Sequence, residues 1–519
     1  MKSFRPQLPF ASRLLFSGLF SGLTGLFTGQ PILAPDAHAR PVQIIHTNDL
    51  HSHLDHAEDP ATGGFAAVKA VIDRLRADAE SRGIPTLVLD AGDFSEGSRF
   101  YFADRSREVW RIMDLMGFDA VTLGNHDWLM GARDLDGVIG DVSPGFELLA
   151  ANFAMPEFEL RHMREKIRPA AEFVRDGLKI AVLGVTTPSF VYDWIAKEGR
   201  ITSHVAAAHR EVPELRSRND AVIVLSHTGL DADLALAKQV PGVDLIVGGH
   251  SHDTLTVPVY IENKRSDRRV PIVQTGKHGI YVGDLLVDIE PDQELKVLRY
   301  HLVPVLRDRE EDPGIARRIA EVEDRLDLDY GRDWLEEVIG SSEVPLERQH
   351  SQIPTAWSRL LTDGMRTATG ADTSFDIPEF TGNRQAAGPL TRRMLMELYP
   401  RQFSFEQKYG WTVWTAEIRG WLLKLALEQA LLRDVVFTAS SVTYRDRNVS
   451  GKRRIDDLRI GGQPIEAMKN YRVAMPEGIG RGVVEINEWF SLIIKRARDT
   501  GVPVWSAVES ELRSRSQMQ

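Results

Sequence analysis

A pattern that occurs five times constrains this chain more than any other feature: a short apolar stretch leads directly into residues that can bind a metal ion. The first example is the stretch 42–45, which is followed by Asp49 and His51. Such stretches are typical of buried strands, and a carboxylate and an imidazole two residues apart can reach one cation. The other stretches are 86–90 before Asp93, 120–123 before Asn125 and His126, 221–225 before His227, and 243–247 before His250 and His252. Five strands that end in ligand-type residues predict a metal site.

Helical segments separate these predicted strands. Apolar residues recur at helical spacing over 64–82, and further helices are predicted over 105–116, 204–218 and 231–239. The continuous apolar stretch 178–185 predicts one more buried strand. Alternating strands and helices are typical of α/β proteins with a largely parallel, covered sheet. Ligands of such sheets gather beyond the carboxyl ends of the strands, which is where the Asp, Asn and His residues lie.

After the last of these residues the pattern changes to strands without intervening helices, over 272–275 and 281–289, which are expected to finish this sheet or to form a second one. The charged segment 307–337 is expected to be a linker helix, and 338–508 a mixed α+β domain. The polar tail 509–519 is expected to be frayed. The elements predicted for this second domain are strands over 411–416 and 471–475 and helices over 355–369 and 419–432.

The seven ligand-type residues suit two divalent ions. Two neighbouring cations need a bridging carboxylate, because an anion between them offsets their repulsion, and Asp93 is the candidate for this bridge. Nitrogen and oxygen ligands without thiolate favour Zn²⁺, Mn²⁺ or Fe²⁺ and do not distinguish among them. Water held by such a pair has a pKa lowered toward neutrality and can attack phosphorus in line. Asp49, His51 and His252 would complete one site, and Asn125, His227 and His250 the other.

Each of these residues also has an ordinary structural explanation. A single Asp or His at the end of a strand more often caps a turn or a helix than binds a metal. Seven such residues after five successive strands make coincidence a poor explanation, so the metal interpretation is preferred. His126 adjoins a predicted ligand and is assigned to the substrate side, where an imidazolium can stabilise the transition state or protonate the leaving oxygen. Asp127 either orients His126 or begins a helix.

The N-terminus has the features of an export signal. Three basic residues precede an apolar run over 14–27, and Ala-His-Ala ending at Ala39 suits a signal peptidase. Cleavage after Ala39 would remove 1–39 and leave a periplasmic or secreted protein. Polar residues and glycines interrupt the apolar run, and no later stretch reaches the roughly 20 apolar residues of a membrane span. No stable membrane insertion is expected.

Composition narrows the classes of partner. The formal charge of −11 repels nucleic acid and argues against a phosphate-backbone partner. A small anionic substrate remains compatible with it, because two bound dications would reverse the sign of the local field. The chain has no cysteine, which excludes disulfides and a lipid-anchored N-terminal cysteine. The expected partner is therefore a small-molecule phosphate ester.

Five short motifs carry a family resemblance when they are taken together. They are His46-Thr47-Asn48-Asp49-x-His51, Gly92-Asp93, Gly124-Asn125-His126, Ser226-His227 and Gly248-Gly249-His250-x-His252. In this order they resemble the motifs of the calcineurin-like metallophosphoesterases, in the form found in secreted 5′-nucleotidases. The resemblance implies a four-layer αββα catalytic domain over 40–306 with a dinuclear site at the ligands already assigned. Relatives often have Gln or Asn at the position of His252, so the histidine here would supply an additional nitrogen donor to one metal.

The region 338–508 resembles the C-terminal substrate domain of the same family. Five of its segments match the landmarks of that domain in order: 338–340, 363–366, 370–372, 387–391 and 471–474. Where relatives carry Asn-x-Gly-Gly-x-Arg, this chain reads Phe-Thr-Gly-Asn-Arg, so only Arg384 carries over as a phosphate-side contact. The glycine-rich segment 478–484 lacks the aromatic residue that stacks on a base in relatives. These departures bear on nucleotide specificity rather than on hydrolysis.

Two further features set this chain apart. Leu129 stands where relatives have an Asp three residues after the catalytic histidine. An aromatic group, Tyr409, Trp411 and Trp414, can stack on a base or sugar, but aromatic residues that alternate along a strand more often face a core, which is the preferred interpretation.

The sequence thus predicts an exported two-domain phosphohydrolase that uses two metal ions to cleave a phosphomonoester. A 5′-nucleotide is the leading substrate class, with a role in nucleotide catabolism. A phosphodiesterase for 2′,3′-cyclic nucleotides and a hydrolase of a non-nucleotide phosphate ester remain open. A catalytically silent ligand-binding protein on the same fold also remains open, although the intact set of ligands argues against it.

Overall fold

The computed structural model describes residues 40–155, 160–188, 200–266, 268–291, 293–449, 452–482 and 497–517. Arg40–Gln519 forms one compact unit, and the predicted signal peptide, with its cleavage point after Ala39, lies outside the described residues. Within the part that is described, every helix is too short or too polar to cross a lipid bilayer.

Two sheets form the centre of the N-terminal domain. The first has seven strands: β1 (Pro41–Thr47), β2 (Thr86–Asp90), β3 (Ala120–Thr122), β4 (Glu147–Leu149) and β6 (Ile167–Arg168) are parallel, and β14 (Tyr281–Asp288) and β15 (Lys296–Pro304) extend it antiparallel beyond β1. The second has six: β8 (Leu178–Thr186), β10 (Ala221–His227), β11 (Leu245–Gly248) and β13 (Arg269–Val273) are parallel between the antiparallel edges β7 (Ala170–Arg175) and β12 (Val259–Glu262).

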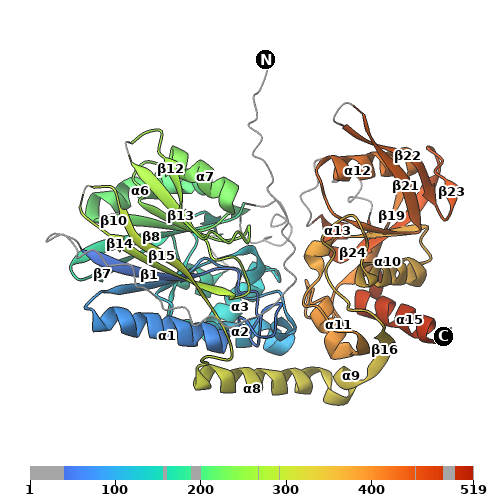
Figure 1. Ribbon diagram of the computed structural model, residues 1–519, viewed down its shortest axis with the longest axis horizontal. Helices are drawn as coiled ribbons and strands as arrows, with labels where there is room; N and C mark the ends of the chain where they lie inside the picture. Colours follow the sequence, from blue (N-terminus) through green and yellow to red (C-terminus); the bar gives the residue numbers. More distant parts are fainter. Residues whose placement is uncertain are drawn as a thin grey trace, which may run out of the picture. The chain divides into compact units, whose positions relative to one another are not determined.

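Helices cover the outer faces of both sheets (Figure 1). Helices α1 (Phe65–Ser81), α2 (Arg107–Leu115) and α3 (Ala132–Val142) lie on the first sheet, and α6 (His204–Arg218) and α7 (Leu230–Gln239) lie on the second. The two sheets pack on each other through fully buried apolar side chains such as Ile44 from β1 and Ile223 from β10. The expected four-layer αββα fold is therefore confirmed.

Strand β8 shows why its sequence reads as continuously apolar. Ile180 and Val182 face the other sheet, whereas Ala181 and Leu183 face the helices of the outer layer. A parallel strand between two layers buries both faces, so it needs apolar residues at every position. Gly184 lets the sheets approach, because a Cβ there would come within 2.3 Å of the Cβ of Leu149 in β4.

The helix predicted over 105–116 begins later than expected. Asp104, Arg105 and Ser106 have φ angles of 45°, 55° and 69°, and α2 starts only at Arg107. Three consecutive left-handed residues cannot continue a right-handed helix, so α2 is separated from the short segment η1 (Arg99–Ser106), whose last residues form this kink. The smaller elements of this domain are η2 (Asn125–Asp127), α4 (Arg161–Lys166) and the pair β5 (Phe153–Ala154) and β9 (Arg200–Ile201).

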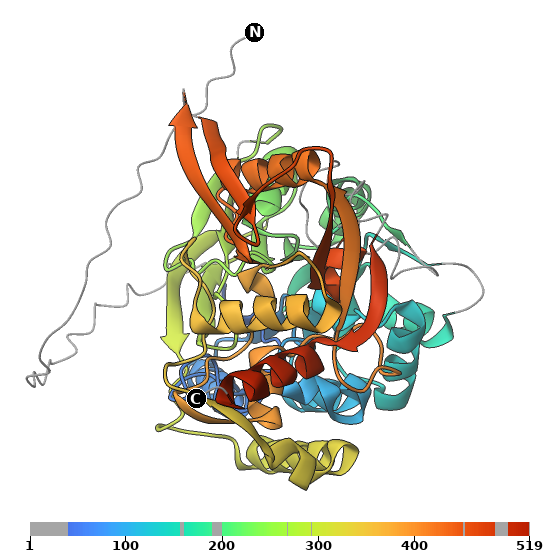
Figure 2. The same cartoon turned by 90° about the vertical axis from the view of Figure 1, so that its right-hand side faces the viewer.

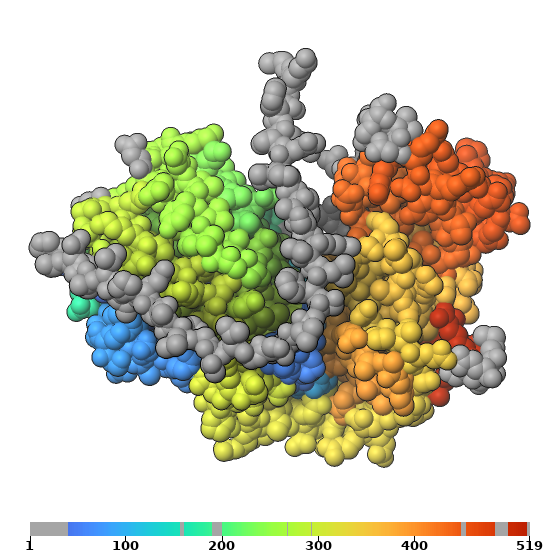
Figure 3. Space-filling view, viewed as in Figure 1, coloured from blue at the N-terminus to red at the C-terminus, as the bar shows by residue number. Residues whose placement is uncertain are grey.

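The charged linker segment contains α8 (Pro313–Tyr330) followed by α9 (Arg332–Glu336). Asp312 caps α8, because its Oδ1 accepts a hydrogen bond of 2.7 Å from the backbone N–H of Ile315. Ile315, Val322 and Leu326 are buried on one side of α8. Its other side carries charged residues and forms part of the surface, yellow at the bottom of Figure 3. The linker is thus half packed rather than fully solvated.

A five-stranded sheet organises the C-terminal domain. Its strands are β20 (Thr438–Ser440), β17 (Thr373–Asp376), β24 (Asn470–Pro476), β19 (Thr412–Arg419) and β25 (Arg498–Pro503), in that spatial order. The remaining elements are the helices α10 (Ala356–Thr369), η3 (Pro378–Phe380), α11 (Arg392–Leu398), α12 (Gly420–Leu432), α13 (Glu477–Arg481) and α15 (Val504–Gln517), the pair β16 (Val338–Ser342) and β18 (Gly388–Thr391), and β21 (Val442–Val449), β22 (Lys452–Ile460) and β23 (Gln463–Pro464). The predicted mixed α+β domain is confirmed.

The expectation of a frayed tail after residue 508 is wrong. Helix α15 continues to Gln517 and packs beside α10, as Figure 2 shows for the dark red helix. Leu512 is buried, and a Cβ at Gly340 would come within 2.5 Å of its Cγ. The segment is polar because only a narrow stripe of the helix is buried. One apolar residue among charged ones is enough to fill that stripe.

The aromatic group divides between core and surface. Trp411 is buried against Phe403 and Phe380, with ring centroids 4.7 and 4.8 Å away, so the core interpretation is confirmed for it. Tyr409 is exposed and lies 5.3 Å from the ring of Trp334.

Candidate metal centre

The five ligand-bearing loops meet at one place between the two sheets. Two groups of three side chains lie there, and within each group the potential ligand atoms are all within 4.8 Å of one another. Loops after β1 and β2 of the first sheet, the last residue of β10 and the loop after β11 of the second sheet supply them. The groups are Asp49, His51 and His252, and Asp93, His227 and His250.

Asp93 contacts members of both groups. Its Oδ2 lies 3.0 Å from Nε2 of His227 and 3.9 Å from Nε2 of His51. Nε2 of His227 also lies 3.2 Å from Oδ1 of Asn125, the remaining predicted ligand. Asp49 belongs to the other group, with Oδ1 3.3 Å from Nε2 of His252. The predicted ligands thus lie together, and the bridging role of Asp93 stays a prediction.

The donor set fits divalent cations. Asp49 and Asp93 are buried, and their partners in the described part of the chain are imidazoles, an amide and backbone N–H groups. The two buried carboxylates supply negative charge and oxygen donors, and the four imidazoles, in their neutral form, supply nitrogen donors. Divalent ions need both. These N and O donors without thiolate suit Zn²⁺, Mn²⁺ and Fe²⁺ alike.

Five residues at the site have a left-handed backbone conformation, which residues other than glycine rarely adopt. Asp49, His51, Asp93, His250 and His252 have φ angles of 53°, 48°, 58°, 75° and 59°. Left-handed backbone costs about 1–3 kcal/mol at each such residue and persists only where surrounding contacts hold it. Among these contacts, the N–H of Asp49 donates to Gly92 O over 2.9 Å and that of His51 to Asp93 O over 2.8 Å. Strain concentrated on ligand residues is typical of a functional site.

Backbone carbonyls set the orientation of two ligand imidazoles. Nδ1 of His51 lies 2.7 Å from the carbonyl oxygen of Glu96, and Nδ1 of His227 lies 2.7 Å from that of Ala91. A carbonyl accepts only from N–H, so each contact places the proton on Nδ1 and leaves Nε2 free for a cation. The side chain of Asn48 orients a carboxylate in a similar way, because its Nδ2 donates a hydrogen bond of 2.6 Å to Oδ2 of Asp49.

The carboxylate of Asp127 serves the backbone of two loops. Its oxygens accept hydrogen bonds of 2.7 to 3.0 Å from the N–H groups of Gly124, Asp93, Phe94 and Ser95. These four bonds leave the ring of His126 without a contact to Asp127 among the interactions of the described residues. Asp127 is the third residue of η2, and its bond from the N–H of Gly124 stabilises the start of that helix, which favours the helix-start alternative over the one in which Asp127 orients His126.

Glu96, which the sequence did not single out, takes the place beside His126 that was one of the two alternatives for Asp127. Its Oε2 lies 2.5 Å from Nδ1 of His126, and its side chain is 1% exposed. Leu129, at the position where relatives carry an Asp, is buried in the core. The signal in the sequence is an acidic residue three positions after Asp93, but a single sequence does not indicate which loop faces His126.

The electrostatics of the site couple carboxylates and imidazoles. Burial alone would raise the pKa of Asp93, but the imidazoles of His227 and His126 outweigh it and hold that pKa well below its usual value. Burial alone would lower the pKa of His126, but the carboxylates of Asp93 and Glu96 outweigh it and raise that pKa. Burial lowers the pKa of His250 to about 4.

Exposure differs sharply across the site. The side chains of Asp49 and Asp93 are 0% and 2% exposed, whereas those of His126 and His252 are 26% and 36% exposed. The two imidazoles are therefore the solvent-facing part of the site, and the two carboxylates are buried.

Arg384 lies apart from these contacts. It is exposed and its Nε donates to Glu347 over 2.9 Å. Its role at a substrate phosphate stays a prediction.

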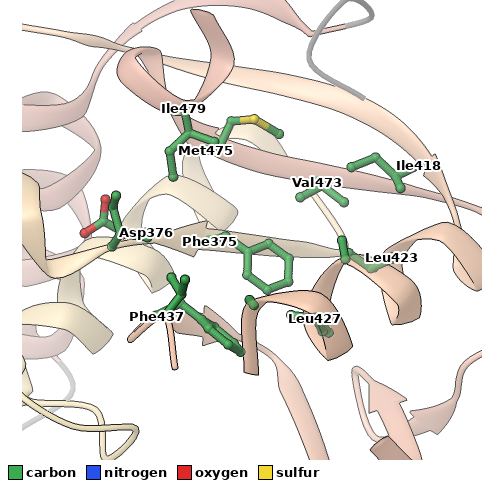
Figure 4. Close-up of a pocket in the computed structure, with 13 residues that line it drawn as sticks. Phe375, Asp376, Ile418, Leu423, Leu427, Phe437, Val473, Met475 and Ile479 are labelled. Atoms are coloured by element: carbon green, nitrogen blue, oxygen red, sulfur yellow. The ribbon is translucent and has the colours of Figure 1, made fainter. Parts of the chain in front are cut away.

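The C-terminal domain also contains an apolar cavity of about 70 Å³ (Figure 4). Phe375 and Phe437 lie among the side chains that line it, together with Leu423 and Leu427 of α12. The carboxyl group of Asp376 accepts a hydrogen bond of 3.4 Å from the hydroxyl of Tyr399. An apolar lining does not suit a phosphate ester, so this cavity is no rival to the metal centre.

Comparisons with known proteins match both parts of the chain. A family model described as calcineurin-like phosphoesterase matches residues 42–254, and one described as the 5′-nucleotidase C-terminal domain matches residues 338–491. The first range contains all seven predicted ligands.

Individual proteins resemble the chain over most of its length. It is 28% identical over 492 residues to protein UshA of Yersinia enterocolitica, covering 83% of this chain and 84% of that protein. It is 30% identical over 320 residues to a 5′-nucleotidase of Diplobatis ommata, covering 56% and 52% of the two chains. The crystal structure of a 5′-nucleotidase precursor from Thermus thermophilus matches with a TM-score of 0.76 at 23% identity, covering 92% of this chain and 97% of that one. This last likeness shows a shared fold.

Proposed function

Since the chain belongs to the calcineurin-like phosphoesterases that carry a 5′-nucleotidase C-terminal domain, and is thereby a metal-dependent phosphoester hydrolase, we propose that it removes the phosphate from a 5′-nucleotide. The observation that carries the proposal is the convergence of the ligand groups around Asp49 and Asp93 beside His126. The name of the Diplobatis ommata relative supports the nucleotide, as does the match to a C-terminal 5′-nucleotidase domain. The N-terminal pattern ending at Ala39 supports export to the periplasm or beyond.

The metals would be held by the predicted residues. Asp49, His51 and His252 would hold one ion, Asn125, His227 and His250 the other, and Asp93 both. Bound there, divalent ions supply a nucleophile that is available at neutral pH and neutralise charge on the phosphoryl oxygens.

His126 serves the substrate in this proposal. Glu96 contacts Nδ1, so Nε2 is the nitrogen that can face a substrate. An imidazolium there can donate a hydrogen bond to a phosphoryl oxygen or give its proton to the leaving oxygen. Its partly exposed position beside the buried carboxylates suits this role.

The direct test is phosphate release from a panel of esters with Mn²⁺ or Zn²⁺ present. The panel contains AMP, a 2′,3′-cyclic nucleotide, a sugar phosphate and p-nitrophenyl phosphate. Preference for AMP supports the 5′-nucleotidase proposal. Preference for the cyclic nucleotide would indicate a phosphodiesterase instead, and preference for the sugar phosphate a hydrolase of non-nucleotide esters. Metal binding without turnover of any ester would favour a catalytically silent binding protein.

Two variants separate the roles of the residues. Because Asp93 contacts both ligand groups, we expect Asp93→Ala to empty both metal sites. His126→Ala should keep its metal and lower turnover by about 10²–10⁴, the range for a positioned acid or base. Metal analysis of both purified variants checks this, and full occupancy in Asp93→Ala would contradict the bridge.

A further inference from the structure

We propose that Glu96 positions the imidazole of His126 and that Arg401, from the C-terminal domain, completes the arrangement. The inference deepens the proposed function and rests on the use of His126 in hydrolysis. It identifies the carboxylate that replaces the missing Asp at Leu129, and it gives the C-terminal domain a residue that supports the chemistry.

Glu96 holds His126 at two points. Its Oε2 lies 2.5 Å from Nδ1 of the ring, and its backbone N–H donates to the carbonyl oxygen of His126 over 3.2 Å. The ring of His51 packs edge-on against that of His126, with centroids 4.9 Å apart. Since a carboxylate fixes one nitrogen and a neighbouring ring limits rotation, Nε2 is directed away from Glu96.

Arg401 bonds to the same carboxylate. Its Nη1 donates to both oxygens of Glu96, over 3.1 and 2.9 Å. Its Nε donates to Phe380 O over 3.0 Å and its Nη2 to Glu379 O over 3.1 Å, so the backbone of the C-terminal domain fixes the guanidinium. The arginine side chain is 11% exposed and the glutamate 1%. A carboxylate so deeply buried needs a fixed cationic partner, and Arg401 supplies one.

The other two candidates for this task are committed elsewhere. Both carboxylate oxygens of Asp127 accept hydrogen bonds from backbone N–H groups of two loops. Leu129 is apolar and packs in the core. Glu96 therefore takes up the role of orienting the ring.

One detail makes the proposal separable from metal binding. Glu96 contacts His126 through its side chain but contacts the ligand His51 through its backbone carbonyl, over 2.7 Å. A substitution at position 96 removes the first contact and keeps the second. We therefore expect Glu96→Ala to bind its full complement of metal.

The first experiment measures kinetics and metal content together. Turnover of AMP and of p-nitrophenyl phosphate by Glu96→Ala should fall about 10–100-fold in kcat with little change in KM, the range for residues that orient a functional group. Glu96→Gln, which keeps one acceptor oxygen, should recover part of the loss. Unchanged kcat in Glu96→Ala, or loss of metal in step with activity, would overturn the proposal.

A double-mutant cycle tests whether Glu96 acts through His126. In the His126→Ala background, Glu96→Ala should cost nothing further, because the ring that it positions is gone. A merely structural glutamate would lower kcat by the same factor in both backgrounds. The cycle works on whichever ester is turned over, so it fails independently of the preference for 5′-nucleotides.

Arg401→Met tests the contribution of the C-terminal domain, with Arg392→Met as the matched control. Arg392 is similarly buried, at 13% exposed, and pairs with Glu509 and Glu337 instead. We expect kcat to fall about tenfold in Arg401→Met and to stay unchanged in Arg392→Met. Equal effects of the two substitutions would reduce Arg401 to an ordinary structural ion pair.

A crystal structure of Glu96→Ala supplies a readout that needs no activity. The ring of His126 should leave its position or occupy several rotamers, while His51 and Asp93 stay in place. A ring that keeps one well-ordered orientation without the carboxylate would contradict the proposal even if no ester were turned over.

Discussion

One carboxylate, that of Asp127, joins the two loops that carry Asp93 and Asn125. It accepts four backbone N–H groups, and a buried donor left without a partner costs about 1–3 kcal/mol. We expect Asp127→Ala to lower the free energy of unfolding by about 2–5 kcal/mol, less than the sum because water can enter the vacated space. Asp127→Asn, which keeps one oxygen, should lose less. Chemical denaturation measures both, and lost turnover with unchanged stability would instead support a catalytic Asp127.

Helix α15 was not predicted from the sequence, and its C-terminal half is held by one buried apolar contact. Leu512 packs against β16 where Gly340 leaves room for it. Leu512→Ala should lower the free energy of unfolding by about 2–4 kcal/mol, because a buried cavity replaces the side chain. The matched control is Ser514→Ala, an exposed change on the same helix, which should be nearly neutral. Thermal unfolding of both variants checks this, and equal midpoints would mean that the helix end is frayed after all.

Bound cations should stabilise the molecule as a whole, because their ligands come from loops of both sheets. A ligand at 100 times its dissociation constant adds about 2.7 kcal/mol to the folded state. We expect a chelator to lower the unfolding temperature of the wild type and to leave that of Asp93→Ala unchanged. Differential scanning calorimetry with and without chelator makes the comparison. A shift of the same size in both proteins would mean that the chelator acts on something other than this site.

Local pattern determined much of the fold without tertiary information. The strand Thr86–Asp90 and the helix His204–Arg218 have the predicted bounds, because continuous apolar runs and amphipathic spacing are properties of neighbouring residues. The convergence of the candidate ligands could be predicted for a related reason: parallel strands bring their carboxyl ends to one edge, so residues that follow such strands meet in space.

What only the tertiary structure decided involves partners far apart in the chain. Glu96 and Arg401 are separated by 305 positions, and neither periodicity nor spacing in one sequence indicates that they pair. The same holds for Leu512, whose burial depends on the space left by Gly340 in a distant strand. The sequence by itself determined the strands and helices that local patterns specify, and it named the candidate ligands that the fold brings together. The folded chain alone determined which carboxylate orients His126, because that depends on which loops face each other and on which side chain already has its hydrogen bonds.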